Sequence, residues 1–390
     1  MWVVLSRKNS PPWGFHGKTG FKRVRPQSGK GNWEAFNSQS SIKRNPDPDD
    51  RRGFWLFAEP SAHTYGAMNV FVTGGAGYIG SVCVEELLNA GHSVTVFDNL
   101  SEGHRSAVDP RASFVGGDFS DRSLIDSVIG QVKPEAVIHF AAHALVGESM
   151  TNPSKYFRNN VASGINLLDA CVTHGVRKFV FSSTCATYGI PEKMPMDETL
   201  PQRPVNPYGE SKLMFERILS WYRDLHCLEF VAFRYFNAAG ASAQFGEHHR
   251  IETHLIPNVL KVALGQKDQV DIYGTDYPTP DGTCIRDYIH IADLAQAHIQ
   301  ALAPGKHGFF NLGNGSGFSV REVIEACRRI SGQPIAVVEK DRRPGDPPRL
   351  VAAAQKAATE LGWQPRFPHL DQIVQTAWDW HVKHPDGYPD

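Results

Sequence analysis

Cysteine is scarce in this chain of 390 residues, and it is not arranged for a disulfide framework or a zinc site. The six cysteines are widely scattered, with no CxxC pair and no Cys/His spacing typical of a zinc ligand set. Such a pattern is typical of proteins in a reducing compartment. We therefore expect reduced, buried thiols and a cytoplasmic location.

Long hydrophobic runs are also missing. No apolar stretch approaches the roughly 18 residues that a membrane helix needs, and the apolar core of the opening "MWVVLSRK" is too short for a secretory signal. We expect no membrane partner. A strong charge bias is absent as well, because the net charge is -1. The exception is the segment 1–67, which carries eleven Lys and Arg against five Asp and Glu.

Residues 1–67 lack a hydrophobic period of 2 or 3.6 residues and are rich in Gly, Pro, Ser, Asn and charge. They also lack the arginine-rich helix or regular aromatic spacing that would indicate nucleic-acid binding. We predict a disordered N-terminal extension and no nucleic-acid partner. Because Met68 stands immediately before a strong strand pattern, we also hypothesise that the native protein starts at Met68.

From Asn69 onward, short apolar runs alternate with helical stretches. The runs include "NVFVT", "SVTVF", "AVIHFAA", "KFVFSS" and "EFVAFRYFN". Continuous Val/Ile/Phe strands separated by helices predict an α/β fold, with a Rossmann-type doubly wound parallel sheet covered on both faces. After about residue 240 this regularity fades. We therefore predict a first domain at residues 68–240 and a smaller C-terminal α/β substrate domain at residues 241–390.

A glycine-rich turn follows the first predicted strand. In "VFVTGGAGYIGS", Gly75, Gly77 and Gly80 have GxGxxG spacing, and Gly74 extends the pattern to TGxxGxxG. Glycines at these positions allow a tight turn and a close approach of the backbone to a pyrophosphate. The N-terminus of the following helix offers N–H groups to the same anion. This context predicts a dinucleotide site.

Two aspartates follow the next strands. Asp98 ends "SVTVFD", eighteen residues after Gly80, where a carboxylate accepts hydrogen bonds from the adenosine ribose hydroxyls. The same carboxylate repels a 2'-phosphate, so NAD is favoured over NADP. Asp118 follows "SFVGGD" and is placed to approach the adenine. An ordinary turn residue at the end of a strand explains Asp118 equally well.

A tyrosine and a lysine lie four residues apart in "NPYGESK". Tyr208 and Lys212 share one face of a predicted helix, one helix after the strand "KFVFSST". A lysine ammonium and a positive nicotinamide would favour the phenolate. Tyr208 would then take a proton from an alcohol while hydride leaves the same carbon for NAD. Thr184, at the end of that strand, would hold the reacting oxygen by a hydrogen bond.

Blocks from Met68 to Asp390 resemble the extended short-chain dehydrogenase/reductase family, and within it the UDP-glucose 4-epimerases, also called UDP-galactose 4-epimerases. They include "VTGGAGYIGS", "SSTCATYG", "NPYGESK", "FRYFNAAGA", "GTDYPTPDGTCIRDYIHIADLA" and "RRPGDPPR", in the family's order. The resemblance implies that residues 68–240 bind NAD, that residues 241–390 bind the UDP-sugar, and that residues 284–303 return to the first domain. It also implies a homodimer, formed through helices near residues 154–174 and 209–226.

The activity that the resemblance implies is an NAD-dependent isomerisation in galactose metabolism. Tyr208 would remove the O4 proton of a UDP-hexose as hydride passes from C4 to NAD. The resulting 4-keto sugar would turn in its pocket and receive the hydride on its opposite face, with no net redox change. Lys212 would hold the nicotinamide ribose and lower the pKa of Tyr208.

Further site residues are carried over from the matching blocks. The implied cofactor-binding residues are Gly74, Gly77, Tyr78, Ile79, Gly80, Asp98, Asn99, Asp118, Phe140, Ala141, Asn160, Ser183, Lys212 and Phe236. The implied substrate-binding residues are Thr184, Tyr208, Asn237, His254, Arg286, Arg343 and Asp346. Arginine suits a diphosphate because its planar fork meets phosphate oxygens in pairs.

Other functions remain open at this stage. A nucleotide-sugar 4,6-dehydratase needs an acid pair directly after the threonine, where this chain has Cys185 and Ala186. A UDP-xylose/UDP-arabinose 4-epimerase or a UDP-N-acetylglucosamine 4-epimerase would share the same blocks. Leu350 stands where a bulky tyrosine confines the sugar pocket in the family, and leucine is intermediate in size. A non-catalytic NAD-binding protein would usually lack the Tyr208–Lys212 pair.

The histidine-rich stretch "EHHRIETH" contains His248, His249 and His254. Their spacing does not match a zinc motif. We interpret the stretch as a loop of the substrate domain, in which His254 lines the UDP pocket, and we predict no metal site.

Overall fold

The computed structural model describes residues 66–343 and 345–389. The predicted disordered extension, residues 1–67, lies outside the described residues up to residue 65. No helix in the described part of the chain is long and apolar enough to cross a membrane.

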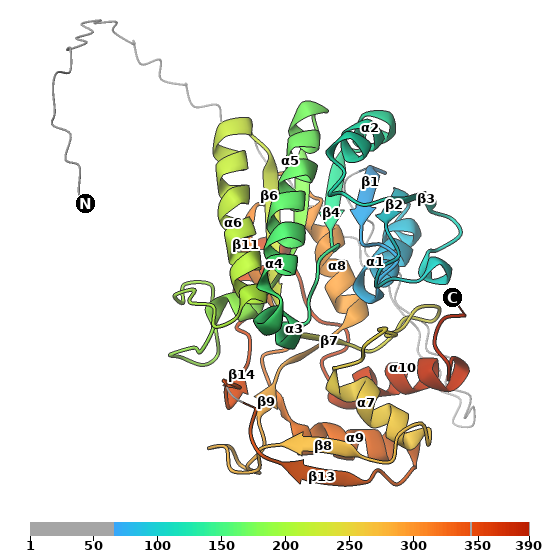
Figure 1. Cartoon of the computed structure of the whole chain (residues 1–390), viewed down its shortest axis with the longest axis vertical. Coiled ribbons are helices and arrows are strands. Elements are labelled where there is room, and N and C mark those ends of the chain that lie inside the picture. Colours follow the sequence, from blue (N-terminus) through green and yellow to red (C-terminus); the bar gives the residue numbers. More distant parts are fainter. Residues whose placement is uncertain (1–65, 344, 390) are drawn as a thin grey trace, which may run out of the picture. The chain divides into compact units, whose positions relative to one another are not determined.

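The described chain is built around a seven-stranded sheet in the order β11-β6-β5-β4-β1-β2-β3 (Figure 1). Every neighbouring pair in it is parallel. Its strands are β1 (Asn69–Thr73), β2 (Ser93–Asp98), β3 (Ser113–Gly116), β4 (Ala136–His139), β5 (Lys178–Thr184), β6 (Glu229–Tyr235) and β11 (Gly308–Leu312). The strand order reverses between β1 and β4, and ligands of such sheets bind beside the carboxyl ends of the strands at this point.

Helices cover both faces of the sheet. On one face α1 (Tyr78–Asn89) packs against α8 (Ile291–Ala301). On the other lie α2 (Arg122–Val132), α5 (Gly164–Thr173) and α6 (Pro207–His226), and Figure 1 shows α5 and α6 in front of the sheet with α8 behind it. Side chains of one strand alternate between the faces. Val70 and Val72 therefore join the core beneath α1 and α8, while Phe71 joins the core beneath α2 and α5.

The later part of the chain has its own core. Helices α7, α9 and α10 pack together around residues such as Leu260, Val323 and Ile373, beside the β8–β13 pair (Figure 1). The remaining elements are α3 (Val146–Thr151), α4 (Pro153–Tyr156), β7 (Asn237–Ala239), α7 (Leu255–Ala263), β8 (Val270–Tyr273), β9 (Ile285–Arg286), β10 (Tyr288–His290), β12 (Phe318–Ser319), α9 (Val320–Ser331), β13 (Val337–Lys340), β14 (Arg349–Leu350) and α10 (Leu370–Lys383), with short helical turns at Arg105–Ala107, Phe157–Ser163, Cys185–Tyr188 and Ala357–Leu361. Because α8 and β11 pack with the first sheet, the chain crosses between the two cores more than once. The domain boundary near residue 240 stays a prediction.

Helix α6 begins where its local sequence dictates. Asn206 is the N-cap, and its side chain accepts the N–H of Gly209 at 2.8 Å. Pro207 occupies the first turn, where its fixed φ suits a helix and its missing N–H costs nothing. This start places Tyr208 in the first turn and Lys212 one turn later, beside the end of β5.

Candidate active site

The turn between β1 and α1 is closely packed on one side and open on the other. A Cβ added at Gly80 would lie 2.1 Å from the carbonyl oxygen of Gly74, so only glycine fits there. At Gly77, the N-cap of α1, an added Cβ would meet a single atom of the described residues within 4 Å, at 3.4 Å. The N-cap glycine supplies no side-chain cap. The first N–H groups of α1 are therefore available to an anion, which fits the pyrophosphate of a dinucleotide.

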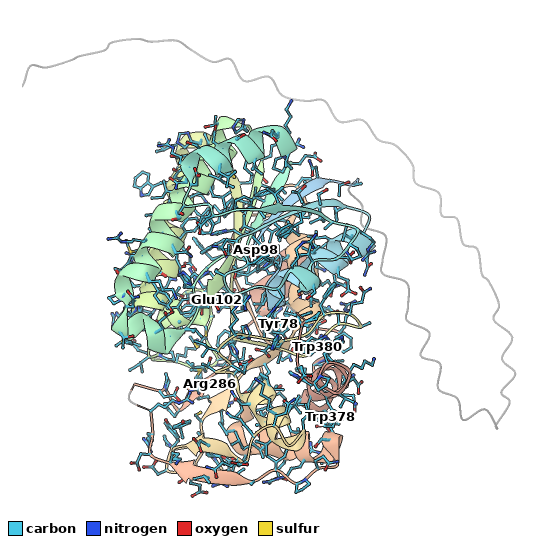
Figure 2. All side chains as sticks on the ribbon, turned by 45° about the vertical axis from the view of Figure 1, so that its right-hand side comes forward. Tyr78, Asp98, Glu102, Arg286, Trp378 and Trp380 are labelled. Carbon is cyan, nitrogen blue, oxygen red and sulfur yellow. The ribbon has the colours of Figure 1, made fainter. Side chains whose placement is uncertain are left out.

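Asp98 lies against this turn (Figure 2). Its Oδ2 accepts the N–H of Ala76 at 3.0 Å, and its Oδ1 accepts the N–H of Leu100 at 2.8 Å. Burial raises the pKa of Asp98, against the effect of these two hydrogen bonds. A carboxylate oxygen can accept two hydrogen bonds. Each oxygen of Asp98 thus keeps one acceptor position for a ribose hydroxyl.

The neighbouring residues Asn99 and Asp118 contact each other. Nδ2 of Asn99 donates to Oδ2 of Asp118 at 2.8 Å, and the N–H of Ser120 donates to Oδ1 at 2.8 Å. Burial acts to raise the pKa of Asp118, but these hydrogen bonds outweigh it and lower the pKa. The structure therefore brings the predicted ribose and adenine residues together at the ends of β2 and β3.

Phe140 and Ala141 follow β4, across the switch point from the glycine turn. Their N–H groups both donate to the carbonyl of Thr73, at 2.9 and 3.2 Å. A Cβ added at Gly74 would lie 2.5 Å from the nitrogen of Ala141. The ends of β1 and β4 thus close together beside the turn.

Several other predicted cofactor residues have side chains that hold the scaffold. Oδ1 of Asn160 accepts the N–H of His143 at 3.0 Å, and its Nδ2 donates to Oγ of Ser211 at 3.1 Å. The hydroxyl of Ser183 donates to Glu216 at 2.6 Å. The side chains of Asn160 and Ser183 thus hold helices and loops around the site, and their contact with the cofactor stays a prediction.

Three further residues of the predicted cofactor set lie in or against cores. Tyr78 is buried, and its hydroxyl donates to the carbonyl of Gly240 at 2.7 Å, which ties α1 to the segment after β7. Ile79 packs against the core beneath α1, and Phe236 is buried beside Tyr188.

Thr184, Tyr208 and Lys212 meet where β5 ends and α6 begins. A Cβ added at Gly209 would lie 2.6 Å from the carbonyl oxygen of Ala186. Glycine is therefore needed for the first turn of α6 to approach the segment after β5. The Thr184 hydroxyl interacts with that of Tyr208, and Nζ of Lys212 donates to the carbonyl of Ser182 at 2.8 Å. Ser182, which supplies this carbonyl, was not among the predicted residues.

The charges of this group depend on burial. Burial raises the pKa of Tyr208 to about 12, and the hydrogen bond with Thr184 opposes the rise. Burial lowers the pKa of Lys212 to about 7, against the effect of Glu216. In the chain alone the phenol is therefore neutral near pH 7. The lowering of its pKa by Lys212 stays a prediction. A positive nicotinamide beside it would favour the phenolate.

Sequence reasoning missed a buried ion pair behind the catalytic strand. Arg234 on β6 donates to Glu216 on α6 through Nε at 2.9 Å and Nη2 at 2.7 Å, and both side chains are buried. Nε2 of Gln202 donates to the same carboxylate at 3.0 Å. Two signals were available: an arginine inside the apolar strand "EFVAFRYF", and a glutamate four residues after Lys212.

Arg286 and Asp346 come from distant segments and form an ion pair. Arg286 lies on β9, in register with Leu350 on β14 (Figure 2 marks Arg286). Its positive charge acts on the thiol of Cys185, whose pKa burial raises to about 12. The predicted diphosphate-binding arginine therefore lies close to the end of the catalytic strand.

The neighbouring Asp287 organises this region and was also missed. Its buried carboxylate accepts the N–H groups of Asn314, Gly315 and Ala352 at 2.8, 2.9 and 3.0 Å. Nδ2 of Asn237 donates to the carbonyl oxygen of Asp287 at 2.9 Å. Asp287 thus joins the loop at 314–315, the segment at Ala352 and strand β7 beside Arg286.

Two predicted substrate residues make other contacts. Arg343 is exposed, with its guanidinium 4.0 Å from the ring centroid of Tyr273. Nδ1 of His254, before α7, lies 2.9 Å from Glu247 and 3.0 Å from Glu252. Burial acts to lower the pKa of His254, but the two carboxylates outweigh it and raise the pKa to about 10.

A doubly wound parallel sheet, an open glycine turn with Asp98 and a Thr–Tyr–Lys group define a Rossmann-type protein suited to hydride chemistry on a dinucleotide. Residues 70–313 match the model of the NAD dependent epimerase/dehydratase family, and the chain belongs to this family. The match confirms the fold class and the family resemblance that the sequence predicted.

A similar protein and two similar solved structures carry one name, UDP-glucose 4-epimerase. A UDP-glucose 4-epimerase from Lacticaseibacillus casei is 50% identical over 329 residues, which cover 83% of this chain and 99% of the relative. The crystal structure of UDP-glucose 4-epimerase from Brucella ovis in complex with NAD is 46% identical, with a TM-score of 0.78, covering 80% of this chain and 98% of that chain. The Bifidobacterium longum UDP-glucose 4-epimerase, in complex with NAD+ and UDP, is 39% identical with a TM-score of 0.78, covering 82% and 100%.

Proposed function

We propose that this protein catalyses the reversible 4-epimerisation of UDP-glucose and UDP-galactose, with tightly bound NAD as a recycled hydride acceptor. The observation that carries the proposal is the meeting of Thr184, Tyr208 and Lys212 at the carboxyl end of β5. The glycine turn follows β1 of the same sheet. Asp98, which accepts an N–H of this turn, favours NAD over NADP. The family match and the 50% identical relative support the same reaction.

The reaction needs one proton and one hydride to leave and return. Tyr208 would take the O4 proton of the sugar, and bound NAD would supply the acceptor for the hydride of C4. Thr184 would hold O4 during both steps. After the 4-keto sugar has rotated in its pocket, Tyr208 would return the proton to O4, and the hydride would be restored to the other face of C4. Atoms and electrons balance without an external oxidant.

Lys212 has two tasks in this scheme. Its Nζ donates to the carbonyl of Ser182 and lies 4.9 Å from the ring centroid of Phe181. These two contacts hold the amine of Lys212 against β5. From this position it would hold the nicotinamide ribose. In its protonated form it would add to the positive charge of the nicotinamide in favouring the phenolate.

Dehydration is disfavoured by the two residues after Thr184. An elimination needs a general acid and base at that point. Cys185 is a neutral thiol because burial raises its pKa to about 12, and Ala186 has no titratable group. The 4-keto sugar therefore has no partner there for the loss of water.

The sugar pocket is proposed to lie beside Leu350. This side chain packs against the cluster formed by Tyr188, Met196, Phe236 and Ala352, next to Arg286 on the neighbouring strand. Arg286 and Asp346 are proposed to bind the diphosphate and ribose of UDP. Asn237, Arg343 and His254 are proposed to complete this UDP site. A UDP-xylose/UDP-arabinose or UDP-N-acetylglucosamine 4-epimerase is the second candidate, since leucine leaves more room than tyrosine.

The substrate can be identified by one incubation series. Purified protein, without added NAD, is incubated with UDP-galactose, UDP-N-acetylgalactosamine and UDP-xylose, and the products are separated. We expect UDP-galactose to be converted fastest. Faster turnover of either other sugar would transfer the proposal to the second candidate. Absence of interconversion for all three, even with NAD supplied, would contradict epimerase activity.

We further propose a cytoplasmic homodimer. Three exposed apolar side chains, Met214, Trp221 and Leu225, follow one another along α6, and such a row favours a partner helix. All six cysteines, which lie in the described part of the chain, are free, as expected in a reducing compartment. Analytical ultracentrifugation of the wild type and of Trp221→Glu tests the dimer, because the charge would shift the variant toward monomer.

A further inference from the structure

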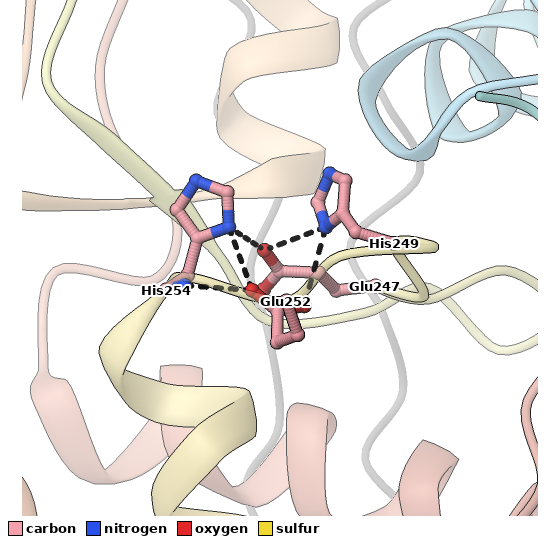
Figure 3. Close-up of side chains that lie close together, drawn as sticks. All are labelled: Glu247, His249, Glu252 and His254. Atoms are coloured by element: carbon pink, nitrogen blue, oxygen red, sulfur yellow. Dashed lines mark hydrogen bonds and ion pairs between the residues drawn. The ribbon is translucent and has the colours of Figure 1, made fainter. Parts of the chain in front are cut away.

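Four metal-type ligands converge in the loop that precedes α7. Glu247, His249, Glu252 and His254 each offer one ligand atom, and these atoms lie within 4.8 Å of one another (Figure 3). All four come from eight consecutive residues with the spacing E-x-H-x-x-E-x-H. In residues 66–343 and 345–389, this is the one group of its kind.

The distances within the cluster are those of close ion pairs. Nδ1 of His254 lies 2.9 Å from Oε1 of Glu247 and 3.0 Å from Oε1 of Glu252. Nδ1 of His249 lies 3.2 Å from Oε2 of Glu252 and 3.5 Å from Oε1 of Glu247. Bonds of about 2.0–2.2 Å in a tetrahedral zinc site separate neighbouring ligand atoms by about 3.3–3.6 Å. Three of the four observed separations are shorter than this range by a few tenths of an ångström, so the side chains would move slightly apart around an ion.

The two carboxylates of the cluster are shielded from water. The side chains of Glu247 and Glu252 are only 6% and 4% exposed. Oε1 of Glu247 is buried and has no hydrogen-bond partner in the described chain, although Nδ1 of His254 lies 2.9 Å away. Carboxylates removed from water need a cation or hydrogen-bond donors. A cation placed between that oxygen and the imidazole nitrogen would bind both atoms.

We propose that Glu247, His249, Glu252 and His254 bind one divalent transition-metal ion of the Zn²⁺ type, through Nδ1 of each histidine and one oxygen of each glutamate. Two carboxylates neutralise the charge of the ion. Imidazole ligands in a tetrahedral arrangement favour Zn²⁺ over Mg²⁺, which takes six oxygens. His254 is 47% exposed, so the site has an entry path from solvent.

This proposal replaces the sequence-based expectation that the stretch holds no metal. That expectation grouped His248 with His249 and His254, and such a trio has no suitable spacing. In the structure His248 turns away from the cluster and stacks on His104, with ring centroids 4.7 Å apart. Glu247 and Glu252 complete the cluster instead of His248. The spacing of the histidines alone does not indicate these two glutamates.

The loop connects the two sides of the molecule, which suggests what the ion would do. Nη2 of Arg250 donates to the carbonyls of Leu100 and Gly103 at 3.3 and 3.2 Å, in the segment that follows Asp98. The ring of His249 meets that of Tyr78 edge to face, with centroids 6.0 Å apart. An ion in this loop would fix α7 relative to the cofactor side of the protein. The proposal goes beyond the proposed function and does not depend on it, although it uses Nδ1 of His254, a residue also proposed to line the UDP pocket.

Metal binding is tested on untagged full-length protein that has been treated with chelator. The protein is dialysed against ZnCl₂ or CoCl₂, freed of loosely bound metal and analysed by inductively coupled plasma mass spectrometry. We expect about one ion per chain, a visible spectrum typical of tetrahedral Co²⁺, and a higher unfolding midpoint. Excess Mg²⁺ should not displace the ion.

Three variants make the assignment specific. His249→Ala and Glu252→Gln should each weaken Zn²⁺ binding about tenfold or more. His248→Asn removes a histidine of the same loop outside the cluster and should bind like the wild type. A folded wild type without stoichiometric metal would overturn the proposal and leave an ion-pair cluster that fixes the loop. So would equal losses in His248→Asn and His249→Ala. Metal content is measured without an epimerase assay, so this result is independent of the proposed function.

Discussion

Arg234 and Glu216 form a buried ion pair held by two hydrogen bonds, at 2.9 and 2.7 Å, directly behind the strand that ends at Thr184. The same carboxylate accepts the hydroxyl of Ser183 on β5. The pair therefore ties β5, β6 and α6 together, one helical turn after Lys212. Its geometry fixes the strand and the helix that carry the catalytic group.

Loss of this pair should destabilise the protein. Glu216→Gln leaves the buried Arg234 charge without its counter-charge, so we expect the free energy of unfolding to fall by about 3 kcal/mol. Asp224→Asn is the matched control, because its partner Arg223 is a surface residue, and it should cost less than about 1 kcal/mol. Chemical denaturation measures both. Equal losses would contradict the assigned importance of the buried pair.

Replacement of the proposed base should abolish turnover but not cofactor binding. In Tyr208→Phe the O4 proton has no acceptor, and we expect kcat to fall by roughly 10²–10⁴-fold. The NAD content of the purified protein should stay unchanged, because the glycine turn and Asp98 are untouched. Tyr222→Phe removes another hydroxyl of α6, bonded to Asp169, and should retain normal turnover. Full activity of Tyr208→Phe would show that the base has been assigned wrongly.

The proposed diphosphate contact should appear mainly in substrate binding. Arg286→Gln removes a charged hydrogen-bond donor, so KM for the UDP-sugar should rise about tenfold or more, with a smaller change in kcat. Arg321→Gln removes a surface arginine paired with Glu339 and should leave KM unchanged. Steady-state kinetics of both variants separate the two effects. An unchanged KM in Arg286→Gln would place the diphosphate elsewhere.

Acid stability should depend on His298, which is buried on α8. Burial lowers its pKa to about 4, despite a hydrogen bond with the carbonyl of Leu294. The unfolded chain binds a proton at His298 below about pH 6.5, whereas the folded chain does not until about pH 4. The unfolding free energy therefore falls as pH falls through this window, by about 1.4 kcal/mol per pH unit from this residue.

His298→Leu removes that titration and should reduce the slope of stability against pH between about 6.5 and 4 by about 1.4 kcal/mol per pH unit. His139, His290 and His381, whose pKa burial also lowers, keep their share of the slope. Denaturation midpoints at several pH values measure the slope. His226→Leu, at an exposed position, is the control and should keep the slope of the wild type. An unchanged slope in His298→Leu would show that the histidine is protonated in the folded protein.

The sequence predicted those parts of the site that depend on local pattern. The glycine turn, Asp98 and the start of α6 follow from residues close together in the chain, and so do Tyr208 and Lys212. The partner of the Ser183 side chain could not be predicted in this way. Neighbouring residues of a strand face opposite sides of the sheet, but the pattern does not say which residue each one meets. In the structure the hydroxyl of Ser182 contacts Tyr235, and that of Ser183 contacts Glu216.

Contacts between distant segments were beyond the sequence pattern. The partner of Arg286 is sixty residues away at Asp346, and tertiary packing of two loops brings them together. The carboxylate of Asp287 holds two such segments, at 314–315 and at Ala352, through backbone N–H groups, which no side-chain motif reveals. The convergence of Glu247 with His254 likewise depends on the path of an irregular loop.

The fate of the hydrogen at C4 tests the central claim most directly. Purified protein is incubated in ordinary water with UDP-galactose that carries deuterium at C4, and the UDP-glucose formed is analysed by mass spectrometry and NMR. Because the hydride passes to bound NAD and returns to the same carbon, we predict that UDP-glucose retains the deuterium at C4. Formation of UDP-glucose without the label, or no conversion with NAD supplied, would contradict the account.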